Sequence, residues 1–142
     1  MPRPGASGKW PGIPRRLASM AYECLLLLAV AAVLVVVPHI LLGAFAHRLA
    51  SPIVVRAHCF LVLLVYFVWF WSNGRRTLAM KTWRMRLLTR DGGPVRPAQA
   101  LLRYLLCWPS LLIGGAGILW GFFDRDRQFL HDRLAGTMLV SE

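Results

Sequence analysis

The chain is poor in acidic residues and rich in uncharged apolar ones. Its 142 residues contain 17 Lys or Arg but only 6 Asp or Glu, which gives a formal net charge of +11. Hydrophobic residues make up 57%, above the usual apolar share of soluble domains. A soluble nucleic-acid-binding protein would also be basic, but it would not contain such long apolar runs. The basic residues fall between those runs, and this pattern predicts an integral membrane protein.

Cysteine is scarce as well. The three cysteines, Cys24, Cys59 and Cys107, are odd in number, form no CxxC motif and each lie in an apolar segment. This usage is typical of small hydrophobic side chains rather than of a disulfide or metal framework.

Catalytic signatures are also missing from the sequence. It contains no Walker A, HExxH or GxSxG motif. His39, His47 and His58 could meet near the outer membrane face as a metal site, but they lack close ligand spacing and a neighbouring carboxylate. We therefore expect neither an enzyme nor a bound cofactor, metal or nucleic acid.

Two long apolar runs predict membrane-spanning helices. The first covers residues 17–46 and the second covers residues 57–74, and a helix needs about 20 residues to cross the hydrocarbon core. Pro38 is expected to kink the first helix near its far end. A cleavable signal peptide is the alternative for the first run, but its charge-free stretch exceeds the ~7–15 residues of a signal-peptide core.

A third apolar run, residues 104–123, is interrupted by Pro109 and by four glycines. It has two interpretations. A kinked third span would place the C-terminus outside the cell. A broken, partly re-entrant helix would keep the C-terminus inside, and membranes tolerate such a helix only where protein covers its loose backbone.

The distribution of basic residues predicts the orientation. Residues 1–14 are rich in Pro and Gly and are expected to form a disordered, basic tail, followed by one membrane domain over residues 15–142. The stretch from 75 to 103 carries eight Lys or Arg against one acid, Asp91. The positive-inside rule therefore places the N-terminus and this basic loop in the cytoplasm, in a multi-pass protein of a cell (inner) membrane.

Within the basic loop, residues 83–88 alternate apolar and basic side chains, which predicts a short strand on the cytoplasmic surface. An interfacial amphipathic helix over residues 77–88 is the alternative. Residues 137–140 could form a second strand. Pairing of the two strands requires both on one membrane face, and this favours a C-terminus inside.

Glu23 is the only acidic residue in the first 90 positions, and it stands at the head of a charge-free run. Arg16, Ser19 and Glu23 share one helix face, with Arg16 and Glu23 about 10 Å apart along the axis. One interpretation is a polar cleft that binds an ion or small solute or relays a proton. A second is a buried polar contact that fixes helix packing. A third places Glu23 in the interfacial zone.

The sequence resembles the RDD family of small membrane proteins, named for one arginine and two aspartates. Arg16-Leu17-Ala18 through Glu23 matches the opening motif, with Glu in place of the family's first aspartate, and residues 131–137 match the closing motif with Asp132 as the second. Residues 77–83, 86–88, 91–92 and 100–103 resemble the segments between, so the resemblance covers residues 13–141.

The resemblance implies a polar cluster and a class of function. The cluster would contain Arg16, Glu23, Asp132 and Arg103, with His131, Arg133, Gly136 and Thr137 supporting it. Solute transport has been proposed for the family, and some members are associated with cation/proton exchange. The expected protein is therefore an all-α membrane protein with two spans and a third, broken membrane segment, which transports an ion or small solute in the lipid bilayer as a homo-oligomer or in a larger complex. The alternative is a non-transporting scaffold or accessory subunit.

Overall fold

The computed structural model describes residues 10–113, 115–125 and 128–141. Most of the predicted N-terminal tail, residues 1–9, lies outside the described residues. The described part of the chain is mostly helical and contains one two-stranded sheet, which confirms the predicted fold class.

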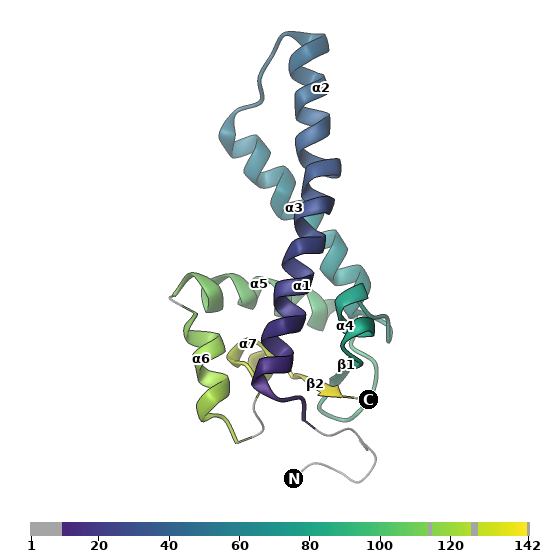
Figure 1. Cartoon of the computed structure of the whole chain (residues 1–142), viewed down its shortest axis with the longest axis vertical. Helices are drawn as coiled ribbons and strands as arrows, with labels where there is room; N and C mark the ends of the chain where they lie inside the picture. Colours follow the sequence, from purple (N-terminus) through teal and green to yellow (C-terminus); the bar gives the residue numbers. More distant parts are fainter. Residues whose placement is uncertain (1–9, 114, 126–127, 142) are drawn as a thin grey trace.

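The first span is one continuous helix built from α1 (Ile13–Ala31), η1 (Ala32–Val36) and α2 (Val37–Ala46). Pro38, where a kink was predicted, follows a π-helical turn, η1, which ends two residues before it within this continuous helix. Proline lacks a backbone N–H and its ring crowds the preceding turn, so a locally widened helix accommodates it. This helix follows the long axis of the molecule in Figure 1.

The second span, α3 (Pro52–Trp71), returns toward the base of the first helix and crosses behind it (Figure 1). Both helices are long and apolar enough to cross a membrane. Each begins about four or five residues before the apolar run that predicted it, because a helix continues into the polar interface beyond the hydrocarbon core. Almost no side chain in the two spans is buried by the protein itself, as expected of lipid-facing helices.

The two predicted strands pair. β1 (Met85–Thr89) lies antiparallel to β2 (Thr137–Ser141). Of the amphipathic helix that was the alternative for residues 77–88, only the short helix α4 (Leu78–Thr82) forms. It begins where the Thr77 side chain accepts a hydrogen bond from the backbone N–H of Met80. The C-terminal strand therefore lies at the same end of the spans as the basic loop (Figure 1).

The third apolar run forms two helices, α5 (Pro97–Leu112) and α6 (Ala116–Phe123), which are bent by 95° relative to each other. Gly115 stands at the start of α6 with φ of 73°, a left-handed conformation that glycine adopts without strain. The helix is thus broken. The pairing of β1 with β2 places the last strand beside the basic loop, which is the arrangement that the broken, re-entrant interpretation requires.

The hydrophobic core lies at the base of the spans rather than between them. It forms where the end of α3, the sheet, α4 and α5 meet, and α5 passes behind the middle of α1 in Figure 1. Its central side chains are fully or almost fully buried: Met85, Leu87, Val95, Ala100 and Tyr104. The helices α4 and α5 and the two-stranded sheet therefore form a compact cap, which closes one end of the two exposed membrane helices.

Candidate functional site

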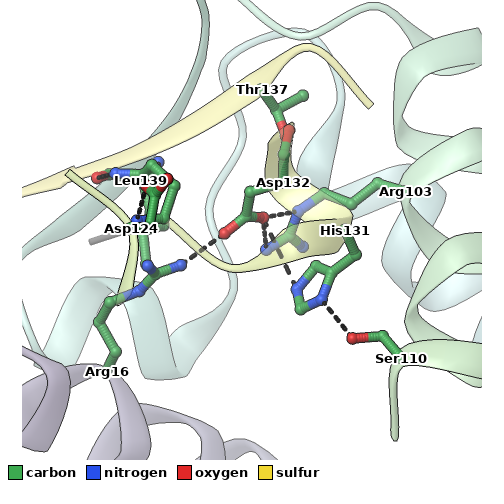
Figure 2. A network of polar contacts seen from close by, with 9 residues as sticks. Arg16, Arg103, Ser110, Asp124, His131, Asp132, Thr137 and Leu139 are labelled. Carbon is green, nitrogen blue, oxygen red and sulfur yellow. Dashed lines mark hydrogen bonds and ion pairs between the residues drawn. The ribbon is translucent and has the colours of Figure 1, made fainter. Parts of the chain in front are cut away.

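Asp132 lies between two arginines at the junction of the cap and the first span. Arg16 Nη2 donates a hydrogen bond to Asp132 Oδ2 at 2.5 Å. Arg103 Nε donates to Oδ1 at 2.7 Å, and its Nη2 lies 2.7 Å from the same oxygen. Figure 2 shows the three side chains converging from separate elements. We call Arg16, Arg103 and Asp132 the buried triad.

The elements that carry the triad are distant in sequence. Arg16 is in the first turn of α1, Arg103 is in the middle of α5, and Asp132 is in the short helix α7 (Leu130–Leu134). After α7 the chain turns into β2 at Gly136, where φ is 70°. A left-handed turn here favours glycine, and it brings the Thr137 hydroxyl within 3.4 Å of the Asp132 carbonyl.

The triad is almost completely removed from solvent. The exposed fraction of the whole residue is 2% for Arg16, 6% for Arg103 and 0% for Asp132. Each guanidinium also lies over an aromatic ring. Arg16 Cζ is 3.8 Å from the Phe129 centroid, and Arg103 Cζ is 4.0 Å from the Trp71 centroid. Charge-assisted hydrogen bonds and cation–π contacts together offset the cost of desolvating these charges.

Asp132 is held as a carboxylate. Burial alone would raise its pKa, but the charges of Arg103 and Arg16 outweigh burial, and the pKa of the carboxyl lies well below its usual range. It therefore keeps its charge throughout the physiological range. A group held so firmly in one state is suited to fixing the position of its neighbours.

His131, next to Asp132, is buried and neutral. Its Nδ1 lies 3.3 Å from Ser110 Oγ, and its Nε2 is 3.7 Å from Asp132 Oδ1 (Figure 2). Burial, with the positive charges of Arg103 and Arg16, lowers the pKa of His131 to about 4 although Asp132 opposes the shift. His131 thus contributes a hydrogen-bonding ring without a charge at neutral pH.

A second group of contacts secures the C-terminal segment, and sequence reasoning missed most of it. Arg133 Nε lies 2.6 Å from Asp124 Oδ1, and the other oxygen of Asp124 accepts a hydrogen bond from the Gln128 backbone N–H at 2.9 Å. The Gln128 side chain accepts from the Leu139 N–H at 3.1 Å and donates to the Leu139 carbonyl at 3.3 Å. The alternating charges around Asp124 could have indicated these contacts in the sequence, but such a pattern is equally typical of a solvated helix end.

Glu23 is not part of the triad. Tyr66 on α3 donates a hydrogen bond to Glu23 Oε1 at 2.7 Å, and within the described residues no ion pair joins Glu23 to Arg16. The reason is geometric: two helical turns, about 10 Å along the axis, separate the two residues, and Arg16 points toward Asp132. The structure therefore brings Arg16, Arg103 and Asp132 together and places Glu23 in a separate contact between the two spans.

Glu23 and the two arginines of the triad nevertheless line one cavity. It has a volume of about 240 Å³ and lies between α1, the lower part of α3 and α5. Arg16, Arg103 and His131 line its inner end together with the buried ring of Phe129. The remaining lining is dominated by Met, Leu and aromatic side chains, so Glu23 is the one acidic group among the described residues that reaches this cavity.

The histidines of the spans form only a pair. The rings of His39 and His58 lie with their centroids 5.1 Å apart, and His39 Nδ1 is 2.8 Å from the Val35 carbonyl. Among the residues that the structure describes, no group of three or more His, Cys, Asp or Glu side chains gathers as a metal site would require.

Comparison with known proteins decides the family. The model of the RDD family matches residues 10–136, which include the whole triad and Glu23. The chain belongs to the RDD family. An uncharacterized protein, RP437, of Rickettsia prowazekii (strain Madrid E) is 29% identical over 99 residues. The match covers 70% of this chain and 56% of the relative, so the chain spans little more than half the length of that relative. No solved structure matches the chain significantly.

Membership of the RDD family clarifies the arrangement. The match contains Arg16 at the head of the first span, Glu23 two turns further along, and Asp132 near the end of the chain. In this RDD protein the arginine and the distant aspartate form one buried ion pair, while the acid of the first span faces the cavity. Arg16 and Asp132 thus lie in one buried contact, and Glu23 lies in another, with Tyr66.

Proposed function

We propose that this RDD protein is a membrane protein, not an enzyme, that moves an ion or small solute across the bilayer by cation/proton exchange. Glu23 would be the acid that exchanges its proton for the transported cation. The observation that carries the proposal is the position of Glu23, which lines a cavity from within a candidate membrane span. Its carboxylate is hydrogen-bonded there to the neutral hydroxyl of Tyr66. An ionisable group at this depth is costly and typically serves a function.

The proposal includes an orientation. The N-terminus, the basic loop and β2 would face the cytoplasm of a cell (inner) membrane. The number of basic residues near that end of the spans supports this, since the positive-inside rule counts Lys and Arg in short loops. The loop between the two spans would then face outward.

We further propose that the protein works as a homo-oligomer or within a larger membrane complex. Two spans and a bent helix pair are too few to surround a path across the bilayer. The spans present large apolar side chains on their surfaces, including Leu25, Leu28 and Ile40, so there is ample area for lipid and for further copies.

A second function has its own supporting observation. Asp132 is 0% exposed and is held between two arginines, an arrangement suited to fixing the cap against the spans. In a scaffold or accessory subunit, this packing would be the purpose of the motif and Glu23 would only join the two spans through Tyr66.

Flux through proteoliposomes distinguishes the two functions. Purified full-length protein would be reconstituted, and Na⁺- and K⁺-driven proton movement would be followed with an internal pH dye. Transport predicts flux in the wild type and its loss in Glu23→Gln with folding intact. Asp91→Asn, which removes an exposed acid of the basic loop, is the matched control and should retain flux. Absence of cation or proton flux from the wild type would reject transport and leave the scaffold function.

A further inference from the structure

We infer that the cavity beside Glu23 binds a small lipophilic organic cation, such as a quaternary ammonium ion. The inference names a substrate class for the transport proposed above and rests on it for translocation, whereas binding can be tested without any transport. It follows from the charge of the cavity, the nature of its lining and the position of its opening.

The charge distribution of the cavity favours a cation. The Glu23 carboxylate accepts its hydrogen bond from Tyr66, a neutral group, and its other oxygen, Oε2, has no hydrogen-bond partner among the described residues. The two cations that line the same cavity, Arg16 and Arg103, are both bound to Asp132 at the inner end. The Glu23 end therefore offers a negative charge in a region of low dielectric, where a cation is the favoured companion.

The oxygen atoms of the lining limit the kind of cation that the cavity can hold. A bare metal ion such as Mg²⁺ or Ca²⁺ needs about six or more oxygen ligands to replace its water. Besides Glu23, the described lining offers the hydroxyl oxygens of Ser19 and Tyr104, and the Tyr104 hydroxyl already donates to the Phe60 carbonyl at 2.9 Å. This set is too small for a divalent metal ion. An organic cation needs only one opposite charge and apolar contact.

The aromatic lining supplies that contact. Two rings of the cavity, Trp71 and Phe129, already have guanidinium groups over their faces. Phe67, Tyr104 and Trp108 line the cavity next to them, with centroid distances of 5.9 Å between Phe67 and Tyr104 and 6.0 Å between Tyr104 and Trp108. Rings grouped in this way attract alkylammonium ions through cation–π interactions.

The cavity is closed at one end and open at the other. The inner end is closed, since Arg16, Phe129 and His131 are at most 4% exposed. At the Glu23 end Cys24 is exposed, and Trp108 and Leu111 are 36% and 47% exposed. The cavity thus opens sideways on the apolar surface of the spans, so a ligand would reach it from the lipid. With a volume of about 240 Å³, it favours a small cation that partitions into membranes.

A matched pair of probes tests the inference. Benzyltrimethylammonium carries a positive charge, and neopentylbenzene has nearly the same shape without it. Each would be titrated into the full-length protein in phosphatidylcholine nanodiscs, with tryptophan fluorescence as the readout because Trp71 and Trp108 line the cavity. We expect the wild type to bind the cation at least about tenfold more tightly than the neutral probe. Equal affinity for the two probes, or no binding of the cation, would overturn the inference.

Three variants localise the effect. Glu23→Gln should weaken binding of the cation about tenfold or more and leave the neutral probe unchanged. Tyr66→Phe keeps the carboxylate and should bind the cation at least as well as the wild type, and Asp91→Asn should match the wild type. Undiminished binding in a folded Glu23→Gln variant contradicts the inference. Binding of the probe without proton flux driven by Na⁺, K⁺ or the probe itself would reject transport alone. Sodium-driven flux without probe binding would reject the organic cation alone.

Discussion

Arg16, in the first turn of the first membrane helix, and Asp132, 116 residues later, form a buried ion pair with a nitrogen–oxygen distance of 2.5 Å. The pair joins the start of the span to the segment that leads into the last strand. Because Arg103 binds the other oxygen of the same carboxylate, one side chain connects α1, α5 and α7. The position of the cap relative to the membrane helices therefore depends on Asp132.

Asp132→Asn should strongly destabilise the protein. The substitution leaves two buried guanidinium groups without a carboxylate, and breaking a buried ion pair from one side costs about 3–5 kcal/mol. Chemical unfolding in detergent, followed by circular dichroism, measures the loss. Asp91→Asn is the control, since Asp91 is exposed and its replacement should change the free energy of unfolding by less than about 0.5 kcal/mol. Similar stability of the two variants would show that the triad does not hold the cap.

The neutral state of His131 predicts a pH dependence of stability. Its pKa is about 4 in the folded protein and 6.5 in an ordinary environment. Between these pH values the unfolded chain binds a proton at His131 that the folded chain does not. The free energy of unfolding is therefore at its full value above about pH 6.5 and falls as the pH decreases toward 4. Asp132 acts in the same direction below the usual carboxyl range, because its pKa is lowered on folding.

His131→Asn should therefore flatten the dependence. Asparagine keeps a polar group near Ser110 but does not titrate, so the free energy of unfolding should fall less between pH 6.5 and 4 than in the wild type. Unfolding curves in detergent at several pH values provide the measurement. His47→Asn, at an exposed position where φ is 50°, is the control and should retain the wild-type slope. Equal slopes in all three proteins would mean that His131 is not the group responsible.

Much of the fold could be predicted because its causes are local. The length of the apolar runs gave the two spans, and Pro109 with the glycines after it gave the break between α5 and α6. The sheet followed from the alternation in residues 83–88 and from the need for both strands on one face. The π-helical turn before Pro38 was not predicted, since the sequence shows that the helix must adjust there but not how.

The site was less accessible to sequence reasoning because side-chain direction depends on packing. Spacing placed Arg16 and Glu23 on one helix face, but it could not show that Arg16 points down to the cap while Glu23 points across to α3. Tyr66 begins an aromatic-rich stretch, residues 66–71, and such stretches are typical of a membrane interface. Nothing in the sequence therefore marked Tyr66 as the partner of an acid 43 residues earlier. Ser110 had no sequence signal at all, because its contact with His131 exists only in the folded chain.

The orientation leads to a third prediction. Reporter enzymes active on only one side of the membrane would be inserted in the loop at residues 49–50 and fused after residue 142. Because β2 pairs with β1 of the basic loop, the C-terminal fusion should report the cytoplasm and the loop insertion should report the outside. An outside signal from the C-terminal fusion would contradict the cytoplasmic placement of the basic loop.

The close approach of α6 to α5 gives the last prediction, Gly117→Ala. A Cβ atom at position 117 would lie 1.5 Å from Ser110 Oγ and 2.6 Å from Ser110 Cβ, so α6 would have to move away from α5. Such overpacking typically costs about 1–3 kcal/mol, measurable as a lower unfolding midpoint in detergent. Gly93→Ala is the control, because its Cβ would meet Thr89 Oγ1 at 3.4 Å, an ordinary contact. Adding Ser110→Gly to Gly117→Ala removes the clashing side chain and should recover part of the loss. Without such recovery, the α5–α6 contact would not be the cause of the instability.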